Sequence, residues 1–181
     1  MKLQNPFQTP NRQRGAALIV ALLMLLVMTV LGVAAMGVTR MEERMAGNTR
    51  DIDVAFQAAE AGLRDSEERI RALTLRPNPT STIPSPIYTQ DLWKTVNLRT
   101  ADYLTWWRTN AIEYGAAGTQ EITDSTRDPR VLTEDMGFVP DSLTVGHGPP
   151  EGRNFYKITS NAAGASNDAN AILESTYTRR Y

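Results

Sequence analysis

The sequence predicts an α+β protein in which one long N-terminal helix packs against a C-terminal antiparallel sheet. An uncharged apolar run occupies 16–38, and a helical pattern continues beyond it in amphipathic form as far as Pro77. Segments of β type, separated by turn residues, follow from Arg130 onward. The length of 181 residues allows one small domain with an appendage. An amphipathic helix needs a second layer to cover its apolar side, and the sheet provides it.

The first element is an apolar helix long enough to span a bilayer. No charged residue lies between Ala16 and Val38, and roughly 20 apolar residues suffice for a span. The charges after the run cancel, whereas the three charged residues before it, Lys2, Arg12 and Arg14, are all basic. The positive-inside rule then predicts a cytoplasmic N-terminus and an outward-facing remainder. A secretory signal cleaved near 33–35 is the alternative, although the run is longer than a typical signal core.

The second part of the helix is amphipathic. An apolar residue recurs at a spacing of three, four or seven positions, which keeps these residues on one helix face. The residues that we predict to pack on the sheet are Ile52, Phe56, Ala59, Leu63, Ile70 and Leu73. Charged residues fill the other faces, and the first clear stop is Pro77. The helix is therefore predicted from Ala16 to about Arg76.

The rest of the chain predicts a small α+β domain. Four prolines between Pro77 and Pro86 predict an extended loop. Spaced apolar residues in 87–128 favour short helical pieces, one around Leu92, Trp93 and Val96 and one around Leu104 and Trp107. Three β segments follow: Arg130–Gly137, Asn154–Asn161 and Asn170–Arg179.

The junction before the apolar run resembles the class III signal of type IV prepilins. A basic leader ends in Arg14-Gly15, and the apolar helix begins at Ala16. The glycine has a physical reason, because a protease beside the membrane can approach a backbone that carries no side chain. The resemblance implies that prepilin peptidase cleaves between Gly15 and Ala16, and that Ala16 is then N-methylated.

Longer stretches resemble the PilX-type minor pilins, and more distantly the GspK-type minor pseudopilins. In the helix the similar segments are Glu42-Glu43-Arg44-Met45-Ala46-Gly47-Asn48 and the run from Ala55 to Arg64. Near the C-terminus they are 137–140, 155–159 and 172–177. The resemblance implies a type IV pilin-like fold and four parts: a leader at 1–15, a membrane-spanning or filament-core helix at 16–39, an amphipathic half-helix at 40–76 and a periplasmic globular domain at 77–181.

The resemblance also implies a function. A protein of this kind is a minor pilin in a tip or initiation complex, which primes assembly of a type IV pilus and helps to present a tip adhesin. Its partners are other minor pilins, the major pilin, the adhesin, prepilin peptidase and the inner membrane. It crosses that membrane once before assembly and is extracellular in the pilus afterwards. The alternatives are a minor pseudopilin of type II secretion and a signal-anchored periplasmic or extracellular binding protein.

Val20 departs from the pattern of most pilins, which carry a glutamate at the fifth position of the mature chain. That carboxylate would pair with the terminal ammonium of a neighbour inside an apolar filament core, where an unpaired charge is costly. A subunit with Val20 is therefore predicted to be a poor repeating unit and to fit a unique site such as the tip. The plain alternative is a tolerated substitution.

Two glycines interrupt the apolar helix, at Gly32 and Gly37. Glycine costs about 1 kcal/mol relative to alanine inside a helix. We therefore expect this segment to be the weakest part of the span and to loosen when the subunit passes from the bilayer into a filament.

Little in the sequence indicates catalysis, a cofactor or a small-molecule substrate. There are no cysteines and one histidine, His147, so thiol chemistry and cysteine or multi-histidine metal sites are excluded. Ser142 lacks a nucleophile motif. With a net charge of −1, the chain offers no nucleic-acid footprint, and Arg179-Arg180 is too small a basic patch. Trp106-Trp107 with Tyr103 predicts either a sugar or adhesive platform or, more simply, aromatics shared between the core and a subunit contact. We therefore expect a protein that is not an enzyme.

Overall fold

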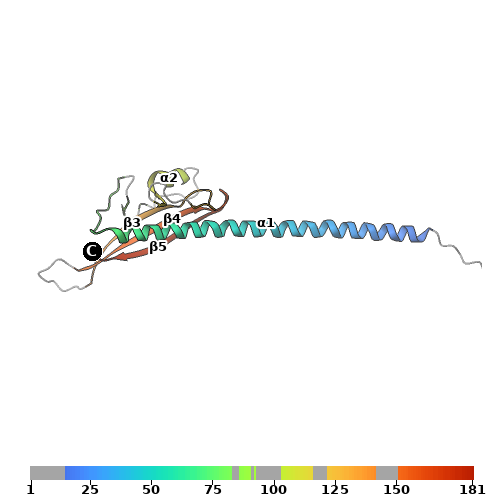
Figure 1. Ribbon diagram of the computed structural model, residues 1–181, viewed down its shortest axis with the longest axis horizontal. Coiled ribbons are helices and arrows are strands. Elements are labelled where there is room, and N and C mark those ends of the chain that lie inside the picture. Colours follow the sequence, from blue (N-terminus) through green and yellow to red (C-terminus); the bar gives the residue numbers. More distant parts are fainter. Residues whose placement is uncertain (1–14, 83–85, 91, 93–102, 116–121, 142–150) are drawn as a thin grey trace, which may run out of the picture. The chain divides into compact units, whose positions relative to one another are not determined.

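The computed structural model describes residues 15–82, 86–90, 92, 103–115, 122–141 and 151–181 (Figure 1). It divides the chain into two compact units, Met1–Ala46 and Gly47–Tyr181. The helix α1 (Ala16–Ala72) begins in the first unit and ends in the second. The predicted α+β class is confirmed, because the later part of α1 packs on a mostly antiparallel sheet.

The helix α1 ends at Ala72, which is earlier than the predicted end at about Arg76. The backbone N–H of Leu73 donates to the carbonyl of Ile70 at 3.2 Å, which tightens the last turn. The side chain of Arg179 also donates to the Ile70 carbonyl and so satisfies an acceptor that the helix end leaves open. Arg76 precedes Pro77, and a residue before proline is disfavoured in the helical region.

Three long strands form the centre of the sheet: β3 (Arg130–Pro140), β4 (Gly152–Ala163) and β5 (Asn170–Arg179). They pair antiparallel in the order β3-β4-β5. All three were predicted, and β5 has the predicted bounds. A bulge interrupts β3 between Asp135 and Gly137, where Gly137 adopts a φ of 109° and donates its N–H to Asp135 Oδ1 at 2.7 Å.

Shorter elements complete the sheet and cover it. The strand β1 (Tyr88–Thr89) pairs parallel to β3, and β2 (Ile112–Glu113) pairs antiparallel to the beginning of β3. The helix α2 (Tyr103–Asn110) occupies one of the two predicted helical pieces. The other piece falls mostly on 93–102, outside the described residues. β1 and β2 were not predicted, because two residues are too short for a periodic pattern.

The sheet is buried on both faces over β3 and β4. Alternate residues of these strands face α1, where Val131, Tyr156 and Ile158 form a core with Ile70 and Ile87. The opposite face packs under α2, as Figure 1 shows, through a second core. Its members are Tyr88, Trp107, Ala111 and Leu132. A strand exposes successive side chains to opposite faces, so each of the two cores takes alternate residues of these strands.

The contact between α1 and the sheet is made largely by small residues. The buried residues of α1 are Ala55, Ala58, Ala59, Gly62, Ser66 and Ile70. A Cβ atom at Gly62 would lie 2.5 Å from Ser160 Oγ and 3.0 Å from Pro129 Cβ. The backbone of α1 therefore approaches β4 and the chain before β3 so closely that only glycine fits at this position.

Two of the six predicted packing residues were wrong. Ile52 and Phe56 expose 59% and 51% of their surface, whereas Ala59 and Ile70 are buried and Leu63 and Leu73 pack on the α1-facing core. The covered side of α1 carries the small residues Ala55, Ala58 and Ala59, and the turn after β4 extends the contact back to Asp51. Ile52 and Phe56 lie within this length of α1 but beside its covered side, so they remain exposed.

We predict that alanine substitutions at two glycines of α1 have opposite effects on stability. Gly62→Ala should destabilise the full-length chain by about 1–3 kcal/mol, because the added methyl overpacks the contact with β4. Gly47→Ala is the matched control. No atom lies within 4 Å of a Cβ at Gly47, so this change should stabilise α1 by up to about 1 kcal/mol. Thermal unfolding of the detergent-solubilised chain measures both, and equal effects would contradict the packing.

Candidate functional site

The apolar part of α1 is the largest exposed hydrophobic surface among the described residues. Every large apolar side chain between Leu18 and Val38 is more than half exposed. This helix is long and apolar enough to cross a membrane, and none of its most apolar window is buried within the chain. Such an area on a folded protein indicates contact with lipid or with other apolar helices.

The polar groups on this surface are satisfied within the helix. The hydroxyl of Thr29 donates to the carbonyl of Leu26 at 2.8 Å, and that of Thr39 donates to the carbonyl of Ala35 at 3.2 Å. A helix that carries its own hydrogen bonds can enter an environment without water at low cost. The surface therefore suits both a bilayer and the interior of a helical filament.

The structure distributes the predicted site residues of the first unit along α1 and does not gather them into a pocket. Gly15 is exposed, and α1 begins at Ala16. Val20 is 54% exposed and lines a groove with Leu23, Met24, Val27 and Met28. Every residue of that groove is apolar, so nothing in it could pair with a charge.

The two helix glycines, Gly32 and Gly37, lie within the continuous α1. No atom approaches within 4 Å of a Cβ built at either position. Neither glycine is therefore required by packing inside the described chain. A role for these glycines would have to come from helix flexibility or from a neighbouring molecule.

Asp51 fixes α1 to the turn between β4 and β5. Its carboxylate accepts hydrogen bonds from the backbone N–H of Ser166 at 2.9 Å and from the Ser166 hydroxyl. These bonds lower the pKa of Asp51 below its ordinary value of 3.8. Nothing in the sequence signals this role, because Asp51 is one of many charged residues in this part of α1.

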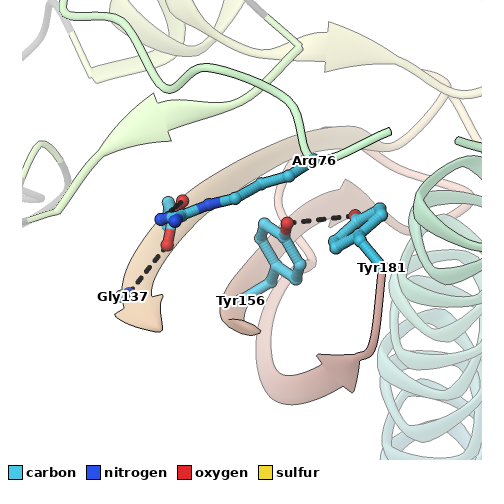
Figure 2. Close-up of polar contacts among 5 residues, drawn as sticks. Arg76, Gly137, Tyr156 and Tyr181 are labelled. Atoms are coloured by element: carbon cyan, nitrogen blue, oxygen red, sulfur yellow. Dashed lines mark hydrogen bonds and ion pairs between the residues drawn. The ribbon is translucent and has the colours of Figure 1, made fainter. Parts of the chain in front are cut away.

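At the end of the domain away from Asp51, residues near the C-terminus contact the sheet, and Figure 2 shows Tyr181 beside Tyr156. The Tyr156 hydroxyl donates to the Tyr181 hydroxyl at 3.0 Å, and burial raises the pKa of Tyr156 well above its usual range. The guanidinium of Arg179 lies 4.9 Å from the centre of the Tyr181 ring. Arg179 binds the end of α1, and Arg180 pairs with Asp141. These two arginines therefore stabilise the fold and do not form a basic patch.

The aromatic residues of α2 anchor it to the sheet. Trp107 is fully buried, and the Trp106 ring meets it edge to face with centroids 5.5 Å apart. The Tyr103 hydroxyl accepts hydrogen bonds from the side-chain amides of Asn161 and Asn170. The two tryptophans therefore do not form an exposed platform together. Their positions favour the simpler interpretation, in which they belong to the core.

No group of three or more metal-binding side chains occurs among the residues that the structure describes. His147 and Ser142 lie outside that part of the chain.

An apolar N-terminal helix that continues as an amphipathic helix and carries an antiparallel sheet defines the type IV pilin class. Two family models match the chain: PilX N-terminal over residues 14–64, and type IV pilus assembly protein PilX C-term over residues 60–179. The second match alone covers more than half of the chain, so the protein belongs to the PilX family of type IV pilus assembly proteins and is a minor pilin. The resemblance predicted from the sequence is thereby confirmed.

The comparisons with curated proteins and with solved structures give no match. The family matches place the apolar part of α1 and the whole described sheet within one family of pilus components. They fit a pilin that is anchored in the inner membrane and later enters the pilus.

We predict that Asp51 makes the domain acid-sensitive. A carboxyl whose pKa is lowered by folding contributes stability above its unfolded pKa, near 3.8, and loses it as the pH falls through the folded value. Unfolding midpoints measured between about pH 6 and pH 3 should therefore fall more steeply in the natural chain than in Asp51→Asn. Asp53→Asn, two residues along on the exposed side of α1, should retain the natural slope. Parallel curves for all three chains would contradict the prediction.

Proposed function

We propose that this minor pilin occupies the tip or the initiation complex of a type IV pilus, where it primes assembly and helps to present a tip adhesin. The observation that carries the proposal is Val20, an apolar residue in an apolar groove at the position where most pilins place a glutamate. Inside a filament core, the terminal ammonium of a neighbouring subunit would find no carboxylate on the apolar part of this helix, 16–38. A buried ammonium without a partner costs several kcal/mol or shifts to its neutral form.

This cost would recur at every contact if the protein formed the shaft. At a single site at the end of a filament it arises at most once, so the subunit can start or terminate a filament but repeats poorly. The proposed partners are therefore other minor pilins, the major pilin below it and an adhesin above it. A minor pseudopilin of a secretion system could carry the same helix, but the family match to pilus assembly proteins favours the pilus.

Processing and topology are part of the same proposal. Prepilin peptidase removes 1–15 by cutting between Gly15 and Ala16, and Ala16 is then N-methylated. The exposed Gly15 and the start of α1 at Ala16 support this cut. The basic residues before the span keep the leader in the cytoplasm, and the domain at 77–181 is periplasmic before assembly.

The exposed part of the amphipathic half-helix is proposed to contact neighbouring pilins. Ile52 and Phe56 are large, apolar and more than half exposed, beside the small residues with which α1 packs on the sheet. In a filament these side chains would meet the helices or domains of adjacent subunits. Gly32 and Gly37 would let the apolar helix adapt as it leaves the bilayer.

Gly15→Val should leave the precursor uncut, because a β-branched side chain crowds the scissile backbone. Mass spectrometry of membrane fractions should find Ala16, methylated, as the N-terminus of the natural protein and Met1 or Lys2 as that of the variant. Gly37→Val, a similar change within the helix, should be cut normally. A natural N-terminus beyond Val33 would instead support the secretory signal.

Val20→Glu should leave tip incorporation unchanged or slightly reduced if the protein sits at the tip, because the added carboxylate has no obligatory partner above it. Immunogold labelling should then find the natural protein and the variant at filament ends in low copy. Loss of the protein should reduce the number of filaments without changing their thickness. Even labelling along the shaft, or a Val20→Glu variant that spreads along it, would contradict the tip position.

Phe56→Gln should reduce incorporation into pili and should lower the unfolding midpoint of the domain far less than a core substitution does, because Phe56 is 51% exposed. Ile70→Gln is the contrasting variant. It places a polar amide in the α1-facing core and should destabilise the chain by about 2–5 kcal/mol. Normal incorporation of Phe56→Gln would remove this residue from the proposed contact surface.

A further inference from the structure

A cleft of about 300 Å³ lies between α2, the start of β3 and the end of β4, and three arginines line it. They are Arg108 from α2, Arg127 from the chain before β3, and Arg130 from β3 itself. Its other lining residues include Thr126 and Asn161, which add polar groups. The cleft is distinct from the apolar part of α1, and the proposed pilus function does not use it.

The three arginines differ in how far they are paired. Arg130 donates from Nη2 to Glu113 Oε2 at 3.0 Å and from Nη1 to the Arg108 carbonyl at 3.1 Å. Arg127 has a buried Nε that finds no hydrogen-bond acceptor among the described residues. The adjacent acid, Asp128, accepts the backbone N–H of Ile122 at 2.9 Å.

The charges around Arg127 agree with these hydrogen-bond contacts. Burial lowers the pKa of Arg127, and the like charges of Arg108 and Arg130 lower it further, while Tyr103 acts in the opposite direction. Three guanidinium groups face Glu113 and Asp128, so the cleft keeps an excess of positive charge. A buried donor without an acceptor and a repelled charge both cost free energy.

An oxyanion would remove both costs at once. Guanidinium groups bind phosphate and carboxylate through paired N–H donors, and these charge-assisted bonds are stronger than neutral ones. A volume of about 300 Å³ is at the lower limit for ligand pockets in proteins, which suits a small anion. We propose that this cleft binds a small oxyanion, phosphate or carboxylate, with Arg127 as its main ligand and Arg108 as the second.

The test uses the full-length chain in a neutral detergent. Its unfolding midpoint and the heat of binding are measured with sodium phosphate, sodium acetate and sodium chloride at equal ionic strength. Phosphate or acetate should give a saturable heat and a rise in the midpoint that chloride does not give. A larger response to phosphate would identify a tetrahedral anion as the ligand, and a larger response to acetate a carboxylate. Equal responses would mean that the cleft accepts both.

Two variants and a control connect the response to the cleft. Arg127→Met should abolish the saturable heat and, without the anion, should unfold at the same temperature as the natural chain or higher, because it removes a partly buried charge that Arg108 and Arg130 repel. Arg108→Gln changes an exposed side chain and should weaken anion binding about tenfold or more. Arg64→Gln, on the exposed side of α1 and paired with Glu60, should leave binding unchanged.

Three results would overturn the proposal. The first is a natural chain that responds to phosphate and acetate no more than to chloride. The second is an Arg127→Met chain that retains the binding heat or unfolds at a markedly lower temperature without anion, since the guanidinium would then be a structural group. The third is an Arg108→Gln chain with natural affinity, a result that remains informative even if Arg127→Met does not fold.

Discussion

The close approach of α1 to the sheet determines the arrangement of the domain. It depends on a series of small residues from Ala55 to Gly62, which let the helix backbone lie almost against β4. Larger side chains there would move the helix outward and separate Ile70 from the core that it shares with Tyr156 and Ile158. The same separation would part Asp51 from the turn that it holds. One helix can thus carry a folded domain with only part of its length while the remainder stays available to other molecules.

The division of α1 between two environments also explains its composition. Its first part has no charge and satisfies its threonine hydroxyls internally, so lipid and an apolar filament core are equivalent surroundings for it. Its second part has one face adapted to a sheet and others to water. Val20 lies in the first part of α1 and is uncharged and apolar like its neighbours. The electrostatic partner that a repeating subunit needs is therefore missing from the apolar part of α1, and the proposed position at the tip would accommodate that absence.

The elements that could be predicted from the sequence are the long ones, in which apolar residues recur at a regular spacing. The long helix, the three long strands and the bounds of β5 follow from periodicity, and the family follows from ordered motifs. The side of α1 that meets the sheet could not be predicted accurately, because the contact is made mostly by small residues, whereas the periodic pattern follows the large apolar ones. Ile52 and Phe56 were misplaced for this reason: they lie close to the buried Ala55 but are themselves exposed. The role of Asp51 and the proposed role of Arg127 depend on residues that are distant in the chain, and neither has a local signature in the sequence.

The bonds that hold the two ends of the domain have a consequence for how it forms. Asp51 is fixed by Ser166, which is 115 positions later, and the end of α1 is capped by Arg179, 109 positions after Ile70. Contacts of such long sequence separation form slowly, because a large loop must close before either bond is made. The helix can enter the membrane early in synthesis, but its domain is complete only after β5 has been made. A subunit interrupted before that strand would keep the apolar helix but would leave the core open where Tyr177 of β5 packs.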